Sequence, residues 1–110
     1  MATKANLIVD QGATFSTVVT LTDTNNDPID LTNYTGAAQI RKTYTSLTAT
    51  DFTVSLGGNT GTIELGLTAN ATMAMASGRY VYDVEVTDAS GVVSRVFEGL
   101  VTVSPNVTKI

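Results

Sequence analysis

The segment with the clearest potential for metal chemistry is DTNNDPID, which begins at Asp23 and alternates oxygen-bearing side chains. Asp23, Asn25 and Asp27 have the spacing of the first three ligands of an EF-hand calcium loop. Pro28 stands where that loop needs glycine, and Tyr34 stands where it needs a bidentate glutamate. We therefore interpret the segment as an Asx-rich turn between strands, with a calcium site as the alternative. The sequence predicts no metal site and no cofactor.

The candidates for acid–base catalysis are Asp83 and Glu85, which alternate along one stretch of chain. Glycoside hydrolysis needs two carboxyl groups that face each other across a cleft. Side chains two residues apart on a strand share one face, so we expect this pair to make the outer surface of a sheet soluble. A lysine–asparagine isopeptide bond could be built from Lys42 with either acid, but it needs a buried lysine. We expect Lys42 to be solvated.

Nucleophilic catalysis lacks its usual partners, because the chain contains no histidine and no cysteine. Serine and threonine are abundant, but no imidazole is present to activate them or to bind zinc. The glycine-rich SLGGNTG lacks the Lys-Ser/Thr ending of a phosphate-binding loop and is interpreted as a hairpin turn. The sequence therefore predicts no catalytic residues and no enzyme activity.

The amino-acid composition indicates which kind of domain holds these residues and which partners it disfavours. The 110 residues suit one domain, 1–110, with a single core. Twenty threonines and a charged fraction of only 15% favour strands over helices, because branching at Cβ suits a pleated backbone. A net charge of -4 with dispersed lysine and arginine argues against nucleic acid and anionic membranes as partners. We see neither a secretion signal nor a transmembrane segment.

Apolar residues alternate with period two in most of the chain, which predicts about seven strands. One short helical turn is expected over 69–76, with Thr68 as its N-cap and Gly78 at its end. We expect a β-bulge near Gly99 and the end of strand pairing at Pro105. The expected strands lie in 5–12, 14–23, 36–44, 77–88 and 92–103, with two more in a hairpin over 51–67. Within 36–44 we expect Ala38 and Ile40 to point inward and Gln39 and Arg41 to point outward.

The segment SGRYVYDV resembles the tyrosine corner of immunoglobulin-like sandwiches. Tyr80 takes the place of the corner tyrosine, and Tyr82 takes the place of the second cysteine in antibody domains. The alternative is that both tyrosines are ordinary strand aromatics. We predict an all-β fold, an immunoglobulin-like antiparallel sandwich of about seven strands with one short helical turn.

The segment TFSTVVTLTD has one face, formed by Val18 and its even-numbered Ser and Thr neighbours, that is uncharged. Two interpretations stay open. Either the face is an assembly surface that acts together with free strand edges, or it is covered within the same domain.

Several short motifs occur in an order that resembles one known family. They are Gly12 with Phe15, Asp30-Leu31-Thr32 through Tyr34, Gln39-Ile40-Arg41, Gly78-x-Tyr80-x-Tyr82-Asp83, and Gly99-x-x-x-Val103-x-Pro105-x-Val107-Thr108. Over residues 8–108 the chain resembles virion structural proteins of tailed bacteriophages, including cyanophages of marine cyanobacteria. It also resembles the N-terminal β-sandwich module of phage baseplate upper proteins.

The resemblance implies a non-enzymatic structural protein of the tail, baseplate, fibre or decoration of a virion, assembled in the host cytoplasm. It implies other virion proteins as partners and leaves a homo-oligomer open. The alternative function is a carbohydrate- or receptor-binding module, for which a host surface glycan would be the partner. An exposed Tyr34 or Tyr44 would favour that alternative, because sugar sites use exposed aromatic rings.

Overall fold

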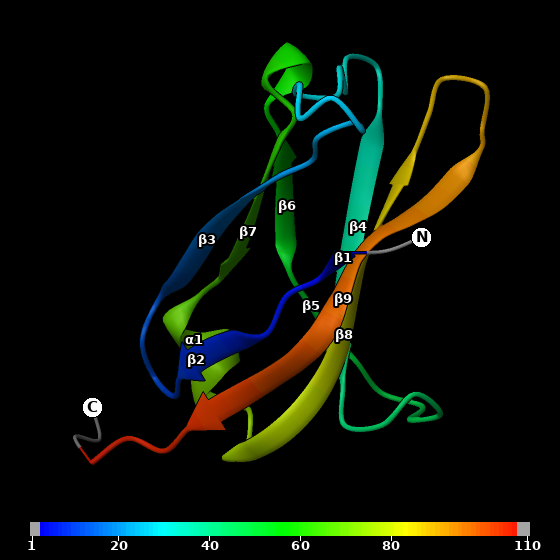
Figure 1. Cartoon of the computed structure of the whole chain (residues 1–110). Helices are drawn as coiled ribbons and strands as arrows, with labels where there is room; N and C mark the ends of the chain where they lie inside the picture. The colour runs from blue at the N-terminus through cyan, green and yellow to red at the C-terminus, as the bar shows by residue number, and fades with distance from the viewer. Residues whose placement is uncertain (1–2, 108–110) are drawn as a thin grey trace.

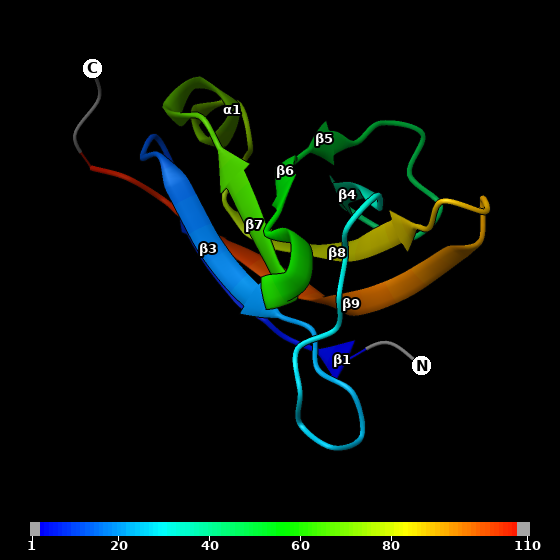
Figure 2. The same cartoon turned by 90° about the horizontal axis from the view of Figure 1, so that it is seen from above.

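The computed structural model describes residues 3–107, which form two β-sheets packed face to face (Figures 1 and 2). Seven of the nine strands in these residues coincide with expected strands, and the other two, β1 and β5, have two residues each. The elements are β1 (Thr3–Lys4), β2 (Leu7–Asp10), β3 (Phe15–Thr20), β4 (Thr35–Arg41), β5 (Thr50–Asp51), β6 (Thr53–Leu56), the 3₁₀ turn η1 (Gly58–Thr60), β7 (Thr62–Leu67), α1 (Ala69–Met73), β8 (Gly78–Thr87) and β9 (Val93–Ser104).

The strand order confirms the predicted fold class. The large sheet has the order β1-β9-β8-β4-β5, with β2 also paired to β9, and the small sheet has the order β3-β7-β6. The chain crosses between the two layers after β2, β3, β5 and β7, so both sheets contain strands from distant parts of the sequence, as in immunoglobulin-like sandwiches. The chain is therefore an all-β, immunoglobulin-like sandwich.

One part of the pairing departs from a purely antiparallel arrangement. β1 and β2 run parallel to β9, with Thr3 opposite Phe97 and Leu7 opposite Val101. The other ladders between named strands are antiparallel. After β2 the chain turns at Gly12, whose φ of 83° favours glycine, and enters the small sheet as β3. The N-terminal segment thus closes one border of the large sheet before it changes layer.

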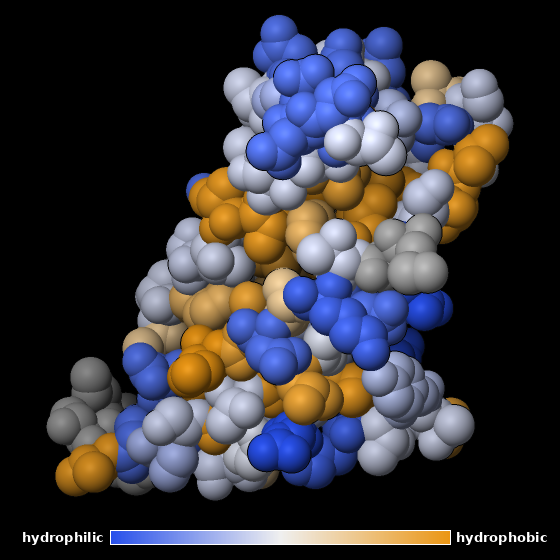
Figure 3. Space-filling model, viewed as in Figure 1, coloured by the Kyte–Doolittle hydropathy of each residue, from blue (hydrophilic) through white to orange (hydrophobic). Residues whose placement is uncertain are grey.

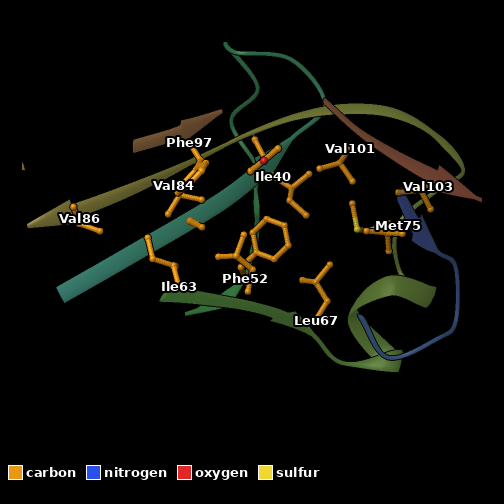
Figure 4. Packing of buried hydrophobic residues seen from close by; sticks show 14 of the residues in the cluster. Ile40, Phe52, Ile63, Leu67, Met75, Val84, Val86, Phe97, Val101 and Val103 are labelled. Carbon is orange, nitrogen blue, oxygen red and sulfur yellow. The ribbon is translucent and has the colours of Figure 1, made fainter. Parts of the chain in front are cut away.

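The hydrophobic core fills the space between the two sheets, with Phe52 near its centre (Figure 4). The Phe52 ring meets Tyr82 edge to face at 6.0 Å between centroids, and it meets Phe15 at 6.2 Å. Such aromatic pairs add to the free energy gained from area burial. The buried hydrophobic residues are Val9, Leu31, Ala38, Ile40, Phe52, Ile63, Leu65, Leu67, Met75, Tyr82, Val84, Val86, Phe97, Val101 and Val103.

The two tyrosines of β8 have different roles. The Tyr80 hydroxyl donates to the backbone oxygen of Ala76 at 2.7 Å, which is the bond of a tyrosine corner and confirms that prediction. Tyr82 is buried in the core, and its hydroxyl donates to the Ala5 oxygen at 2.6 Å. Burial raises the pKa of Tyr82. A large aromatic side chain thus occupies the volume that a disulfide fills in antibody domains.

The helical turn is shorter than expected. Thr68 caps α1, accepting from the Ala71 N–H at 3.1 Å, as predicted, but the helix ends at Met73 and not at 76. The chain leaves the helix early because Met75 turns into the core. Gly78 is the first residue of β8 and does not cap the helix, so that prediction was wrong.

The bulge in β9 also lies elsewhere. Val84 faces Phe97 while Glu85 faces Arg95, which leaves Val96 as the extra residue, three positions before Gly99. Glycine is required at position 99 for another reason, because a Cβ at that position would collide with the Ala5 carbonyl oxygen. The glycine allows the N-terminal chain to approach β9 closely. β9 ends at Ser104, just before Pro105, as expected.

No helix in the part of the chain that the structure describes is long and apolar enough to cross a membrane.

Candidate functional site

A depression lies on the outer face of the large sheet. It has a volume of about 520 Å³, within the range of small-molecule sites. The strand alternation predicted for β4 is confirmed here, because Ala38 and Ile40 point into the core while Gln39 and Arg41 line the outer face. The lining residues are Ala37, Ala38, Gln39, Arg41, Tyr44, Val81, Tyr82, Asp83, Glu85, Arg95 and Glu98.

The loop 42–49 forms one wall of this depression and is held by Arg41. One guanidinium nitrogen donates to the Ser46 oxygen at 2.7 Å, and the other donates to Gln39 Oε1 at 3.0 Å. The loop is tightened further by the Thr43 N–H, which donates to Ser46 Oγ at 3.0 Å. These hydrogen bonds hold the loop against the end of β4.

The fixed loop presents two large side chains to solvent. Tyr44 is 80% exposed and lines the depression, and Leu47 is 99% exposed. Tyr34, the other tyrosine considered for sugar binding, is partly buried against the core. Only Tyr44 therefore meets the condition that favours a carbohydrate site.

Two pairs of polar side chains lie in or beside the depression. Asp83 Oδ2 lies 3.4 Å from Arg95 Nε, and Gln39 Nε2 donates to Asp51 Oδ1 at 2.9 Å. Asp83 and Glu85 share the outer face of β8, as expected, and Glu85 lies opposite Arg95 across the ladder. Both carboxylates are on one strand, so they do not form the opposed pair of a glycosidase.

The predicted Asx-rich turn is present. The Asp23 carboxylate accepts from the backbone N–H groups of Asn25 at 2.9 Å and Asp27 at 3.0 Å. Thr22 and Pro28 bridge the two sides of the turn. No cluster of three histidine, cysteine, aspartate or glutamate side chains that could hold a metal ion occurs within residues 3–107. The carboxylate thus organises its own turn, which is the interpretation that the sequence favoured.

Lys42 is exposed, and its ammonium lies 4.7 Å from the centre of the Tyr80 ring. This is a cation–π contact on the surface, worth about 0.5–1 kcal/mol at exposed sites. Asp83, one of the two acids considered with it, is paired with Arg95. An isopeptide bond needs a buried lysine, and this arrangement does not provide one.

The uncharged face of β3 is a second candidate surface. Ser16, Val18 and Thr20 all point to solvent, and Val18 is 55% exposed. No other element among residues 3–107 covers this face. Of the two interpretations that the sequence left open, coverage within the same domain was therefore wrong.

The polar cluster that shares the depression with Tyr44 was not predicted from the sequence. Gln39 and Arg41 were placed outside, but their bonds to Asp51 and to the loop oxygens join segments that the sequence does not mark as neighbours. The feature of the sequence that could have predicted this cluster was the pair Gln39 and Arg41 on one strand, followed closely by Tyr44 in a loop.

Comparisons with known proteins bear on the fold. No protein-family model matches the sequence, and no curated protein matches it. Among solved structures, the chain is similar to the internalin-like protein lmo2027 of Listeria monocytogenes, with 18% identity and a TM-score of 0.50. It is also similar to a family 123 glycoside hydrolase from Clostridium perfringens, with 13% identity and a TM-score of 0.44.

Both matches cover 94% of this chain, but the chain spans only 28% of the internalin-like protein and 23% of the glycoside hydrolase. At such identity the internalin-like protein shows a shared fold alone, and the second match carries no argument. One fold serves many functions, so neither similarity transfers an activity. The resemblance to phage virion proteins stays a prediction.

Proposed function

We propose that this chain is a non-enzymatic structural module of a tailed-bacteriophage virion, in the tail, baseplate, fibre or decoration, and that it acts by protein–protein assembly. The observation that carries the proposal is the surface of β3, where Ser16, Val18 and Thr20 form an exposed, uncharged row beside an open sheet edge. An open edge offers unpaired N–H and C=O groups that a neighbouring chain can complete.

The virion assignment is supported by the motif order over residues 8–108. Several of these motif residues lie in turns or in the core. Asp30 Oδ1 accepts from the Thr32 N–H and hydroxyl, at 2.9 and 2.6 Å, and Leu31 between them is buried. Thr108, the last residue of the motif series, lies outside the described residues. Such positions maintain a framework, which suits a building module.

Quantitative mass spectrometry of purified particles of the encoding phage tests the proposal. We expect peptides of this chain at a fixed ratio to the major tail proteins. A high copy number indicates a tube or decoration component, and a low one indicates the baseplate. Absence of the chain from purified particles contradicts the virion assignment.

The exposure of Tyr44 favours a second candidate function, binding of a host surface glycan in the depression on the large sheet. Tyr44 supplies an aromatic ring, and Asp83 and Arg95 supply hydrogen-bonding groups beside it. Pyranose rings stack on exposed aromatic rings through their apolar faces.

A glycan array with the wild-type chain tests this candidate. We expect a specific signal that Tyr44→Ala weakens about tenfold, the equivalent of losing one stacking contact. Tyr44→Phe keeps the ring and should retain binding, and Thr45→Ala in the same loop serves as the matched control. The absence of a reproducible signal on the array excludes this candidate.

A further inference from the structure

β3 is the outermost strand of the small sheet and lies at the border of the molecule in two perpendicular views (Figures 1 and 2). All six residues of Phe15–Thr20 pair with β7 on one side. The ladder continues at Leu21, whose N–H donates to the Gly61 oxygen at 2.8 Å. On its other side β3 has no strand partner within residues 3–107.

Alternation identifies the backbone groups at this open side. In a strand, neighbouring residues direct their N–H and C=O groups to opposite edges. Leu21 donates toward β7, so the even-numbered residues Ser16, Val18 and Thr20 direct theirs away from it. The same three residues carry the exposed, uncharged side chains of the outer face.

β3 lacks the features that usually protect an edge. Natural sheets block open edges with charges, proline, bulges or very short strands. Phe15–Thr20 contains no charged residue and no proline, and its ladder is regular over its whole length. β6, at the other side of the small sheet, has four residues and follows the charged Asp51. β3 is thus the longest unprotected edge of the described chain.

We propose that β3 pairs with β3 of a second copy of this chain, antiparallel, about a two-fold axis at Val18. The inference rests on the proposed function, because it names the first partner of the same surface. In this register Val18 faces Val18 of the second copy, and Ser16 faces Thr20. All three residues direct their backbone groups to the edge, so each facing pair exchanges two hydrogen bonds.

The side chains are self-complementary in this register. On the outer face, serine faces threonine and valine faces valine, which are favourable cross-strand pairs. On the inner face, Thr17 faces Val19 of the second copy, and Phe15 faces Leu21. Phe15, Val19 and Leu21 are only partly buried in a single chain, and hydrophobic residues reach the surface along the side between the two sheets (Figure 3). The added strand buries them further.

Charge does not oppose the pairing. The nearest acidic residue on the outer face is Glu64, which lies opposite Val18 on β7. The two copies of Glu64 would be three strand spacings apart, about 14 Å. That distance exceeds the Debye length of about 8 Å at physiological ionic strength, so their repulsion is screened.

The predicted product is a closed, two-fold dimer with a continuous sheet in the order β6-β7-β3-β3-β7-β6. A second copy of this chain is the preferred partner for the open edge of β3. The same six residues, Phe15–Thr20, form both strands of the pair, and their side chains match in the antiparallel register centred on Val18. A closed pair also uses up the open edge, so it does not propagate into a fibre.

Cysteine crosslinking tests the register directly. The chain has no cysteine, so any disulfide in a single-cysteine variant joins two molecules. Val18 should lie about 5.5 Å from its copy, Cα to Cα, within the range of about 4.4–6.8 Å for disulfides. Val18→Cys should form a covalent dimer under mild oxidation, at least tenfold faster than Ser16→Cys or Thr20→Cys alone. Each of these controls lies about 14 Å from its own copy.

A mixture of Ser16→Cys and Thr20→Cys should crosslink efficiently, because these positions face each other. Equal crosslinking of all three single variants, or failure of the mixture, overturns the register. Light scattering of the wild-type chain gives an independent measurement. A monomer at about 1 mM overturns the dimer altogether.

A charge exchange at Val18 tests the same axis without disulfides. Val18→Lys and Val18→Glu should each be monomeric, because like charges face each other, and their mixture should restore a heterodimer. Val18→Thr keeps the backbone and the neutral side chain and should remain dimeric, and circular dichroism checks that all variants fold. Mass spectrometry of purified particles tests the proposed function separately. If the chain dimerises but is absent from virions, the proposed function is contradicted. If the chain is a monomer but is present in virions, only the dimer inference is contradicted.

Discussion

The two long borders of the sandwich are built in opposite ways. At the large sheet, β9 is covered by β1 and β2, which together form a short strand broken at Ala5 and Asn6. Asn6 Oδ1 accepts from the Leu100 N–H at 3.1 Å, and Ala5 N–H donates to Glu98 O at 2.9 Å. This border is interrupted, and it carries Lys4 on β1.

At the small sheet, β3 runs for six residues without a break, a charge or a proline. The contrast shows that this chain protects the sheet edge at β1 and β2 and leaves the edge at β3 unprotected. Unprotected edges are aggregation sites unless a partner covers them. The difference between the borders is therefore the strongest physical reason to look for a partner strand at β3.

The largest expected effect comes from breaking the protected border with Gly99→Ala. The added Cβ collides with the Ala5 oxygen, so the N-terminal strand must move off β9. We expect a loss of about 3 kcal/mol in the free energy of unfolding, at the upper end for overpacking. Urea unfolding measures it, with the exposed neighbour Thr102→Ala as the control, which should change stability by less than about 0.5 kcal/mol. Equal effects of the two changes would contradict the close approach at Gly99.

Tyr82→Phe should weaken the same border more mildly. It removes the hydrogen bond to the Ala5 oxygen but keeps the ring packed on Phe52. We expect a loss of about 1 kcal/mol in unfolding free energy near neutral pH.

Tyr82→Phe also has a pH signature. Burial raises the pKa of Tyr82 in the folded state, so the neutral hydroxyl favours folding below its ordinary pKa of 10.0. That contribution is lost as the pH rises through the folded pKa. The variant should therefore lose less stability than the wild type between neutral and strongly alkaline pH. Thermal unfolding across this range measures the difference, and identical slopes would exclude a role for Tyr82.

Tyr80→Phe examines a hydrogen bond that belongs to neither border. It removes the bond to Ala76, at the connection between α1 and β8. We expect a loss of about 1 kcal/mol in unfolding free energy and no change in association through β3. Urea unfolding and light scattering measure the two quantities. A loss of association in this variant would show that β3 is not an independent surface.

The smallest effect on stability is expected at the open border itself. Thr20→Lys places a charge on an exposed edge residue that packs against nothing in the core. Its unfolding free energy should change by less than about 0.5 kcal/mol, whereas association through β3 should weaken. Parallel unfolding and light-scattering measurements separate the two. A large loss of stability would mean that Thr20 already has a partner within its own chain.

Acid unfolding of Asp30→Asn adds a control from a turn. Hydrogen bonds from the Thr32 hydroxyl and N–H hold the pKa of Asp30 below its usual 3.8. The folded state therefore gains stability from the ionised carboxylate above that pH and loses it as the pH falls through the lowered pKa. The variant should show a shallower loss of stability in acid, measured by thermal unfolding between neutral pH and about pH 2. An unchanged acid profile would contradict the role of this turn.

Much of the fold could be predicted from local patterns. The alternation of Ala38 and Ile40 with Gln39 and Arg41 gave their faces, and the spacing of Tyr80 and Tyr82 identified the tyrosine corner. These predictions succeeded because strand faces follow from a two-residue period. The bulge was expected near Gly99 because a glycine within a strand can mark either a bulge or a close backbone contact. Only the position of Ala5 in the folded chain distinguishes the two.

The candidate site was less predictable. Tyr44 was named as one of two candidate tyrosines, but only the structure shows that Tyr44 is exposed and that Tyr34 is partly buried against the core. The bond between Gln39 and Asp51 joins β4 to the short β5, a strand too brief to leave a pattern. Contacts between distant segments carry no signature in either segment alone.

The sequence by itself determined that this chain folds as two pleated layers, because alternating apolar and small polar residues can bury one side of a strand and leave the other in water. Only the tertiary structure decided which border is closed and which is open. Both β2 and β3 are short apolar strands in the sequence, and nothing local shows that one finds β9 while the other ends the small sheet. Pairing depends on what stands beside each strand in space, and that is settled by the packing of the whole core.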